Sequence, residues 1–192
     1  MTATITDYDE SEFPGGLDLS DSLLAVLEEW EQSGLAGTHP TNPGGFYGLG
    51  LPFSGTSYSF NDSSLGYSFE AEAASGSTLN YDFGTHTLYG SIAKITIGAG
   101  LDTSGNVTTP IFEFTFDAAL TGTLAQGRTN DVHDTIWGLM NGSVTGATDS
   151  IGTISTGGLV DRLVDGGIDV NDSVADIVGA SFASESELLL AA

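Results

Sequence analysis

Between residues 56 and 116 the chain alternates apolar and polar residues, and this pattern constrains the fold more than any other feature. Side chains along a β-strand point to opposite faces in turn, so the alternation predicts strands with one buried face. Short connections rich in Gly, Ser, Asn and Asp separate most of these segments, which is typical of antiparallel strands. The expected strands are TSYSF (56–60), LGYSFEAEA (65–73), STLNYDF (77–83), HTLYGSIAKITIG (86–98) and PIFEFTF (110–116). Residues 101–109 are expected to form a longer loop or an irregular hairpin.

Helical spacing of apolar residues flanks these strands on both sides. The first such segment has Ser20 or Asp21 as its expected N-cap, and the second has Asn130. The expected helical segments are 19–32, 129–142, a weaker glycine-interrupted one over 146–165, and a short capped one over 171–182. Strands in the middle and helices at the ends predict a single α+β domain, with α-helices packed on one face of an antiparallel β-sheet.

The charge of the chain is strongly acidic, with 26 acidic residues against three basic ones and a formal net charge of −23. Such a field repels nucleic acid and anionic membranes, so neither is an expected partner. Solvation alone explains the acidity, and calcium binding is the functional alternative. Neither a glycine- and aspartate-rich nonapeptide repeat nor an EF-hand loop occurs in the sequence.

The usual catalytic signatures are missing from the sequence. It contains no cysteine, which excludes a disulfide, a thiolate metal site and a cysteine nucleophile. It also lacks a G-x-S-x-G elbow, an H-E-x-x-H zinc motif, a P-loop and a dinucleotide-binding glycine motif. The residues therefore give little support to hydrolase chemistry.

The stretch YDFGTHTLYG (81–90) places Tyr81 and His86 at the two ends of a short turn between expected strands. One interpretation is an edge aromatic residue beside a surface histidine. The other is a metal site, in which the imidazole accepts the phenol proton and makes the tyrosine more like a phenolate. A free phenol has a pKa of about 10 and is a poor ligand while protonated. Phenolate oxygen suits ferric iron, and tyrosine is an axial ligand of haem in some proteins.

The two other histidines each allow a structural and a functional interpretation. His39 lies in a polar loop rich in Gly, Pro and Thr, where it is either solvated or a ligand on a mobile segment. His133 lies between Asp131 and Asp134 at an expected helix start, which could suggest zinc. Helical geometry instead favours packing of His133 against Trp137 near the sheet.

The two ends of the chain raise the question of export. Residues 1–13 have neither a basic nor an apolar region, so no signal peptide is expected there. The C-terminal SESELLLAA ends on five apolar residues. This segment is either a stray tail or an address read by an export machine.

Several segments, in this order along the chain, resemble the secreted bacterial haem-acquisition proteins, the HasA-type hemophores. The segments are NPGGFYG (42–48), HTLYG (86–90) with a tyrosine just upstream, VHDTIWGLMNG (132–142) and the terminal LLLAA. The resemblance implies a curved antiparallel sheet backed by helices, with ferric haem b held between two loops. It implies Tyr81 as the iron ligand, His86 as its hydrogen-bond partner and His39 as the opposite axial ligand. The His39 loop and the turn between Tyr81 and His86 are shorter than in other members of the family.

The resemblance also implies a life cycle: a secreted monomer that takes haem from haemoproteins and passes it to an outer-membrane receptor. Export would use an ABC-type (type I) machine reading the C-terminus, so we expect a haem-binding domain over 1–183 and an export tail over 184–192. An acidic protein repels the haem propionates, so affinity must come from the iron bond and from apolar contacts. The candidate contacts are Phe46, Phe83, Met140 and His133. The alternatives are a secreted calcium-dependent adhesion module and a haem enzyme such as a peroxidase.

Overall fold

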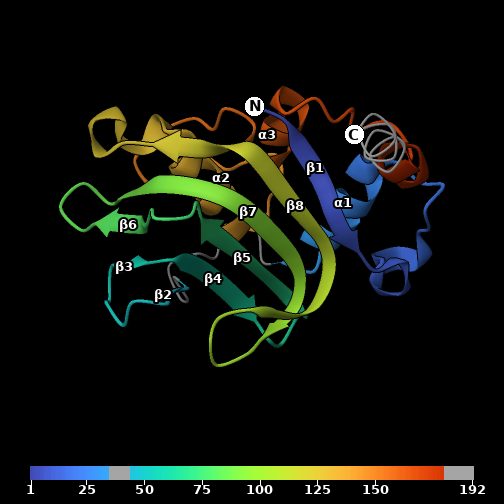
Figure 1. Ribbon diagram of the computed structural model, residues 1–192, viewed down its shortest axis with the longest axis horizontal. Helices are drawn as coiled ribbons and strands as arrows, with labels where there is room; N and C mark the ends of the chain where they lie inside the picture. The colour runs from blue at the N-terminus through green and yellow to red at the C-terminus, as the bar shows by residue number, and fades with distance from the viewer. Residues whose placement is uncertain (35–43, 180–192) are drawn as a thin grey trace, which may run out of the picture.

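The computed structural model describes residues 1–34 and 44–179, in which eight strands form one antiparallel sheet (Figure 1). The strands are β1 (Ala3–Tyr8), β2 (Gly45–Tyr47), β3 (Ser54–Gly55), β4 (Ser57–Asp62), β5 (Tyr67–Ala73), β6 (Leu79–Asp82), β7 (Thr87–Leu101) and β8 (Val107–Gly122). Their order is β1-β8-β7-β5-β4-β2, and β6 pairs with both β7 and β3. The helices are α1 (Leu23–Glu31), α2 (Asp131–Met140) and α3 (Gly158–Asp165), with 174–179 also helical and short 3₁₀ turns η1 (Glu10–Glu12), η2 (Pro14–Gly16) and η4 (Leu124–Thr129).

The predicted α+β domain is confirmed, and its core lies between one face of the sheet and the helices. On β8, Phe112 and Phe114 are fully buried and lie opposite the equally buried Ile97 and Ile95 of β7. Helix α2 packs against these two strands. The alternation that predicted the strands therefore corresponds to a real division of the sheet into a helix-covered face and a more polar one.

Helix α1 is attached to the same face of the sheet by Trp30. The indole ring stacks on Tyr67 of β5 with ring centroids 4.3 Å apart. Its Nε1 donates a hydrogen bond of 3.2 Å to the carbonyl of Gly98 on β7. A buried aromatic residue with its polar atom satisfied in this way fixes the position of the helix as well as burying it.

The sheet is curved because its two longest strands, β7 and β8, bend together (Figure 1). Their register shifts between Ile92 and Lys94 and again between Ile97 and Gly98. Such bulges bend a strand and increase its twist. The beginning of β7 pairs with β6 while its later part pairs with β5. Strands β6 and β5 therefore pair with successive parts of β7.

Several boundaries differ from the sequence-based prediction. The predictions missed β1, β2 and β3. Strands β2 and β3 have only three and two residues, and β1 pairs with β8, which is distant in the sequence. Of the two alternatives expected for residues 101–109, the structure has the hairpin, in which the Asp102 carboxylate accepts the backbone N–H groups of Ser104 and Asn106. The N-cap of α1 is Ser22, and the weak helix over 146–165 is helical only from Gly158.

Asn130 caps α2 as predicted, and its side chain accepts the backbone N–H of His133. No helix within the two described ranges is both long and apolar enough to cross a membrane. The expected division at residue 183 lies outside the described residues.

Candidate functional site

A pocket of about 460 Å³ lies between α2 and strands β2, β4 and β6, a size typical of small-molecule sites. Its described lining residues are Gly44, Gly45, Phe46, Pro52, Phe53, Tyr58, Tyr81, Phe83, His86, Leu88, Arg128, His133, Trp137, Met140 and Ser150. Six of the seven candidate residues from the sequence are among them: Tyr81, His86, Phe46, Phe83, His133 and Met140. The seventh, His39, lies outside the described residues.

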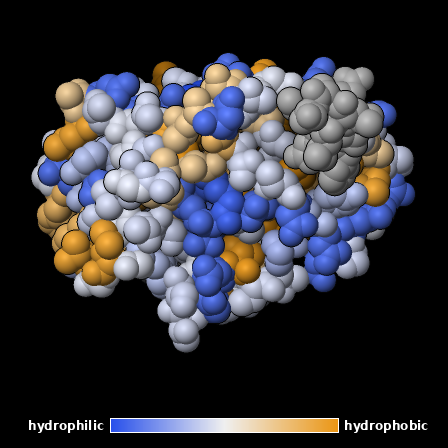
Figure 2. All heavy atoms as spheres, in the orientation of Figure 1, coloured by the Kyte–Doolittle hydropathy of each residue, from blue (hydrophilic) through white to orange (hydrophobic). Residues whose placement is uncertain are grey.

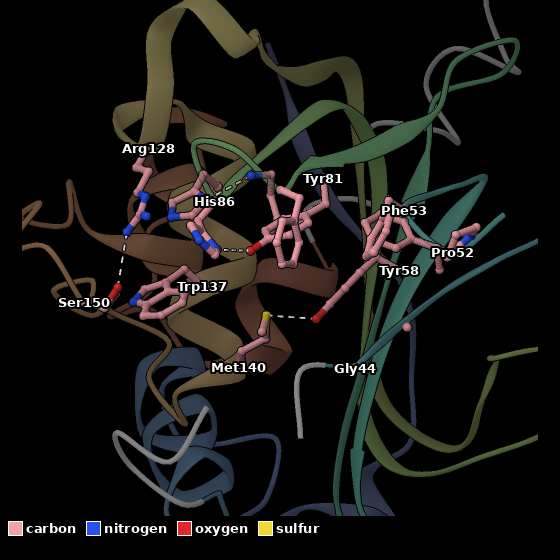
Figure 3. Close-up of a pocket in the computed structure, with 15 residues that line it drawn as sticks. Gly44, Pro52, Phe53, Tyr58, Tyr81, His86, Arg128, Trp137, Met140 and Ser150 are labelled. Carbon is pink, nitrogen blue, oxygen red and sulfur yellow. Dashed lines mark hydrogen bonds between the residues drawn. The ribbon is translucent and has the colours of Figure 1, made fainter. Parts of the chain in front are cut away.

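The Tyr81 and His86 side chains meet at the mouth of this pocket (Figure 3). The Tyr81 hydroxyl lies 2.5 Å from Nδ1 of His86, a short hydrogen bond. Tyr81 is on β6, and His86 is in the turn directly before β7. The turn therefore does bring the Tyr81 and His86 side chains into contact. The role of Tyr81 as an iron ligand remains a prediction.

The turn itself has an unusual backbone at His86. With φ of 54°, His86 is the one non-glycine residue in the described ranges that has a positive φ. Such a conformation costs on the order of 1–3 kcal/mol and persists only where neighbouring contacts enforce it. The Asp82 carboxylate supplies two of these contacts, accepting the backbone N–H and the hydroxyl of Thr85 at 2.7 Å each.

Aromatic rings surround the Tyr81 side chain. The ring centroids of Phe53 and Phe83 lie 6.1 and 6.4 Å from that of Tyr81. This partial burial raises the pKa of Tyr81, the positive charge of Arg128 lowers it, and the negative charge of Asp82 raises it further. The net effect is a raised pKa, so the phenol needs a proton acceptor to become an anionic ligand, and His86 Nδ1 is in position to be one.

His133 is buried in the pocket wall between α2 and β7. Its Nδ1 accepts the backbone N–H of Leu88 at 3.1 Å, which leaves the proton of the neutral ring on Nε2. Its ring stacks on Trp137 with centroids 5.8 Å apart, as the helical spacing predicted. Asn130 donates to the Leu88 carbonyl at 3.0 Å, so α2 is attached to both backbone groups of this strand residue.

The opposite wall of the pocket is built on Tyr58 of β4. Its hydroxyl lies 3.0 Å from the Met140 sulfur, which joins this strand to α2 across the pocket floor (Figure 3). Phe46 packs edge-on against the Tyr58 ring with centroids 5.1 Å apart. Burial raises the pKa of Tyr58 far above its ordinary value, so this residue stays a neutral phenol.

Among the described lining residues, Arg128 is the one basic side chain. Its Nη1 lies 3.1 Å from Asp149, and both side chains are almost completely buried. The ion pair balances the charge of Arg128, so the pocket wall is predominantly apolar and aromatic.

Sequence reasoning missed three important lining residues: Phe53, Tyr58 and Arg128. Tyr58 lies on β4 and Phe53 lies directly before β3. Only the folded sheet brings these two side chains to the pocket. Arg128 could have been noticed, because the chain has only three basic residues. Apolar atoms also gather on the surface at the end of the molecule that carries β3 and the β6–β7 turn (Figure 2), where Leu51, Phe53 and Phe83 are at least half exposed.

Comparison with known proteins confirms the resemblance drawn from the sequence. The family model described as Heme-binding protein A (HasA) matches residues 31–192. The hemophore HasA of Serratia marcescens is 35% identical over 162 residues, which is 78% of this chain and 79% of that protein.

Solved structures with a similar fold include two HasA proteins at 21% sequence identity. The crystal structure of a HasA mutant monomer from Yersinia pseudotuberculosis has a TM-score of 0.66, covering 92% of this chain and 96% of that one. The holo hemophore HasA from Yersinia pestis has a TM-score of 0.63 with the same coverage.

Proposed function

Because the chain belongs to the heme-binding protein A (HasA) family of hemophores, we propose that it captures ferric haem b in the pocket beside Tyr81 and carries it as cargo. The observation that carries this assignment is the 2.5 Å contact between Tyr81 Oη and His86 Nδ1 at the pocket mouth. A tyrosine paired with a proton acceptor, beside an apolar cavity, has the chemistry of a ferric iron ligand.

In this proposal Tyr81 binds the iron as a phenolate and His86 holds the phenol proton. Phenolate is an anionic oxygen donor matched to a hard ferric ion, whereas a neutral phenol binds weakly. Reprotonation of Tyr81 would weaken the bond, which provides a route for release. A carrier needs such reversibility.

The remaining affinity comes from apolar and aromatic contacts. Phe46, Met140 and the stacked His133–Trp137 pair line the interior, and Phe83 lies at the rim with 68% of its surface exposed. Burial of porphyrin faces against such side chains is worth about 25 cal/mol per Å² of apolar surface. With a chain charge of −23, the propionates are best left toward solvent.

His39 is proposed as the opposite axial ligand, on the basis of its position in the family pattern. Two protein ligands on the iron would leave no open coordination position for a substrate, which favours a carrier over a peroxidase. Tyr81 remains the principal ligand in this proposal because its oxygen is anionic.

The proposed cellular route follows the family. The protein would be secreted as a monomer by an ABC-type exporter that reads residues 184–192. It would then accept haem from haemoproteins and deliver it to an outer-membrane receptor. The adhesion alternative requires bound calcium, and within the described ranges no three His, Asp or Glu side chains are grouped to hold a metal ion.

Titration of the purified apo protein with hemin, followed in the Soret region, tests the proposal. We expect a saturable spectral change that breaks at one equivalent. Absence of saturation would contradict haem capture, and calcium-dependent folding of the same sample would favour the adhesion module.

A further inference from the structure

Arg128 connects two walls of the pocket that are distant in the sequence. Its Nε donates to the Thr85 carbonyl at 3.1 Å, in the turn between β6 and β7. Its Nη1 lies 3.1 Å from the Asp149 carboxylate and 3.3 Å from the Ser150 hydroxyl, in the segment between α2 and α3 (Figure 3). One guanidinium group therefore contacts both the turn that carries His86 and the segment between α2 and α3, which lines the pocket through Ser150.

Asp149 gives this bridge a rigid base. Its carboxylate accepts the backbone N–H groups of Ile151 and Thr153 at 2.9 Å each, in addition to Arg128. The side chain of Asp149 is only 2% exposed and that of Arg128 only 10%. Because the neighbouring backbone N–H groups hold the Asp149 carboxylate, the ion pair that it forms with Arg128 is held in place as well.

The other end of the bridge is the peptide that precedes His86. Asp82 holds the N–H and hydroxyl of Thr85, and Arg128 holds its carbonyl. The backbone N–H and the carbonyl of Thr85 are thus both restrained, directly before His86 with its left-handed backbone. These contacts are the kind of local enforcement that a strained conformation requires.

We propose that Arg128 is a positioning residue for the Tyr81–His86 pair, acting through the Thr85 carbonyl to hold His86 where its Nδ1 meets the Tyr81 hydroxyl. The proposal builds on the proposed function, since it assigns the bridge a role in binding ferric haem. Arginine suits this role because its planar fork donates from Nε and Nη1 in fixed directions. Lysine has one ammonium group on a flexible stem and cannot hold both partners in the same geometry.

The test compares Arg128→Lys and Asp149→Asn with the control Arg162→Lys. Arg162 is also buried and is paired with Asp131 and Asp161, but it does not line the pocket. The first measurement uses the apo protein: long-range ¹H–¹⁵N spectra of the histidine rings report whether His86 Nδ1 accepts a hydrogen bond. We expect Arg128→Lys and Asp149→Asn to shift the His86 signals toward those of a solvent-exposed ring, and Arg162→Lys to leave them unchanged.

The second measurement is the rate of haem dissociation from the loaded protein. We expect about tenfold faster release from Arg128→Lys, the loss of roughly one charge-assisted hydrogen bond. The Arg128→Lys/Asp149→Asn double variant should release haem no faster than Arg128→Lys alone, because both changes break the same bridge.

An unchanged His86 spectrum in both Arg128→Lys and Asp149→Asn would overturn the proposal, whatever the haem data show. An equal shift in Arg162→Lys would also overturn it, because the effect would then be general loosening of the fold. If Arg128→Lys does not fold, Asp149→Asn decides. Failure of the parent protein to bind haem would contradict the proposed function, while the apo spectra would still decide whether Arg128 positions His86.

Discussion

His86 reaches the Tyr81 hydroxyl from a left-handed backbone conformation, with 2.5 Å between Nδ1 and Oη. A regular strand residue at this position would place its side chain on one face of the sheet according to the alternation. The turn instead directs the imidazole back across the hairpin. The contact between Tyr81 and His86 therefore depends on the geometry of the turn. Substitutions of the pair itself and substitutions of the residues that hold the turn should have different effects on haem binding.

Removal of the Tyr81 hydroxyl is expected to cost more haem affinity than removal of His39. Tyr81→Phe keeps the ring packed against Phe53 and Phe83 but removes the anionic ligand. We expect a loss of at least roughly a hundredfold, since even the hydrogen-bond partners of metal ligands are worth about 10- to 100-fold. Competitive hemin titration measures this loss. Tyr89→Phe, a strand tyrosine outside the pocket lining, is the matched control.

For His39→Ala we expect a smaller loss, because the imidazole is a neutral ligand whereas the Tyr81 phenolate is an anionic one matched to ferric iron. If His39→Ala loses haem while Tyr81→Phe retains it, the assignment of Tyr81 as principal ligand is wrong.

Replacement of His86 by alanine is expected to change the pH dependence of haem binding. Burial, as the largest cause, raises the pKa of the Tyr81 phenol, so the phenol reprotonates readily when its acceptor is absent. As pH falls, His86→Ala should therefore lose haem at a higher pH than the parent protein. The measurement is Soret absorbance of the loaded protein across a pH series. Coincident curves for variant and parent would show that His86 does not support the ligand.

Gly44 is expected to tolerate no side chain at the pocket edge. Its φ is +74°, and an added Cβ would lie 2.5 Å from the Tyr58 hydroxyl oxygen. Gly50 has a similar φ of +66° with no atom within 4 Å, so Gly50→Ala carries the backbone strain without the clash. We expect Gly44→Ala to be about 1–3 kcal/mol less stable than Gly50→Ala by denaturant unfolding. It should also bind haem more weakly, and equal stability of the two variants would contradict the clash.

Glu70 should make the protein less stable as pH rises through neutrality. Burial, assisted by the negative charge of Glu72, raises its pKa from 4.5 to about 7. Between these values the folded state binds more protons than the unfolded state, so stability is greatest below pH 4.5 for this group and falls as pH rises through 7. Glu70→Gln should remove this dependence and leave the protein more stable than the parent at pH 8.

Thermal unfolding of Glu70→Gln and the parent at a series of pH values checks this expectation. Glu12→Gln, at an exposed position in η1, is the control and should follow the parent curve. A parallel slope for Glu70→Gln would mean that another group controls the pH dependence.

Deletion of residues 184–192 is expected to abolish export without affecting haem binding. The apolar ending follows the last element of the described fold, and the proposed binding residues all precede it. Secretion assays with the native exporter and hemin titration of the truncated protein separate the two functions. Continued secretion of the truncated chain would show that the address lies elsewhere.

Local sequence features were sufficient to predict most of the architecture. Alternation of apolar and polar residues reflects the two faces of a sheet, and helical spacing of apolar residues reflects one buried face of a helix. Strands β4 to β8 and helix α2 could therefore be predicted from the spacing of apolar residues. Asn130 was recognised as a cap because the side chain acts on its own backbone within one turn. Tyr81 and His86 were recognised for a similar reason: both ends of their contact belong to one short segment.

Contacts between distant segments could not be obtained in this way. Strands β2 and β3, with three and two residues, are too short to show an alternating pattern, and β1 pairs with β8, which is distant in the sequence. The pocket wall joins Tyr58 of β4 to Met140 of α2 across 82 positions of sequence, so it forms only when the sheet and α2 pack together. The bridge from Arg128 to Thr85 and Asp149 is of the same kind. No local pattern encodes it, because its three members meet only after the sheet has curved and α2 has packed against it.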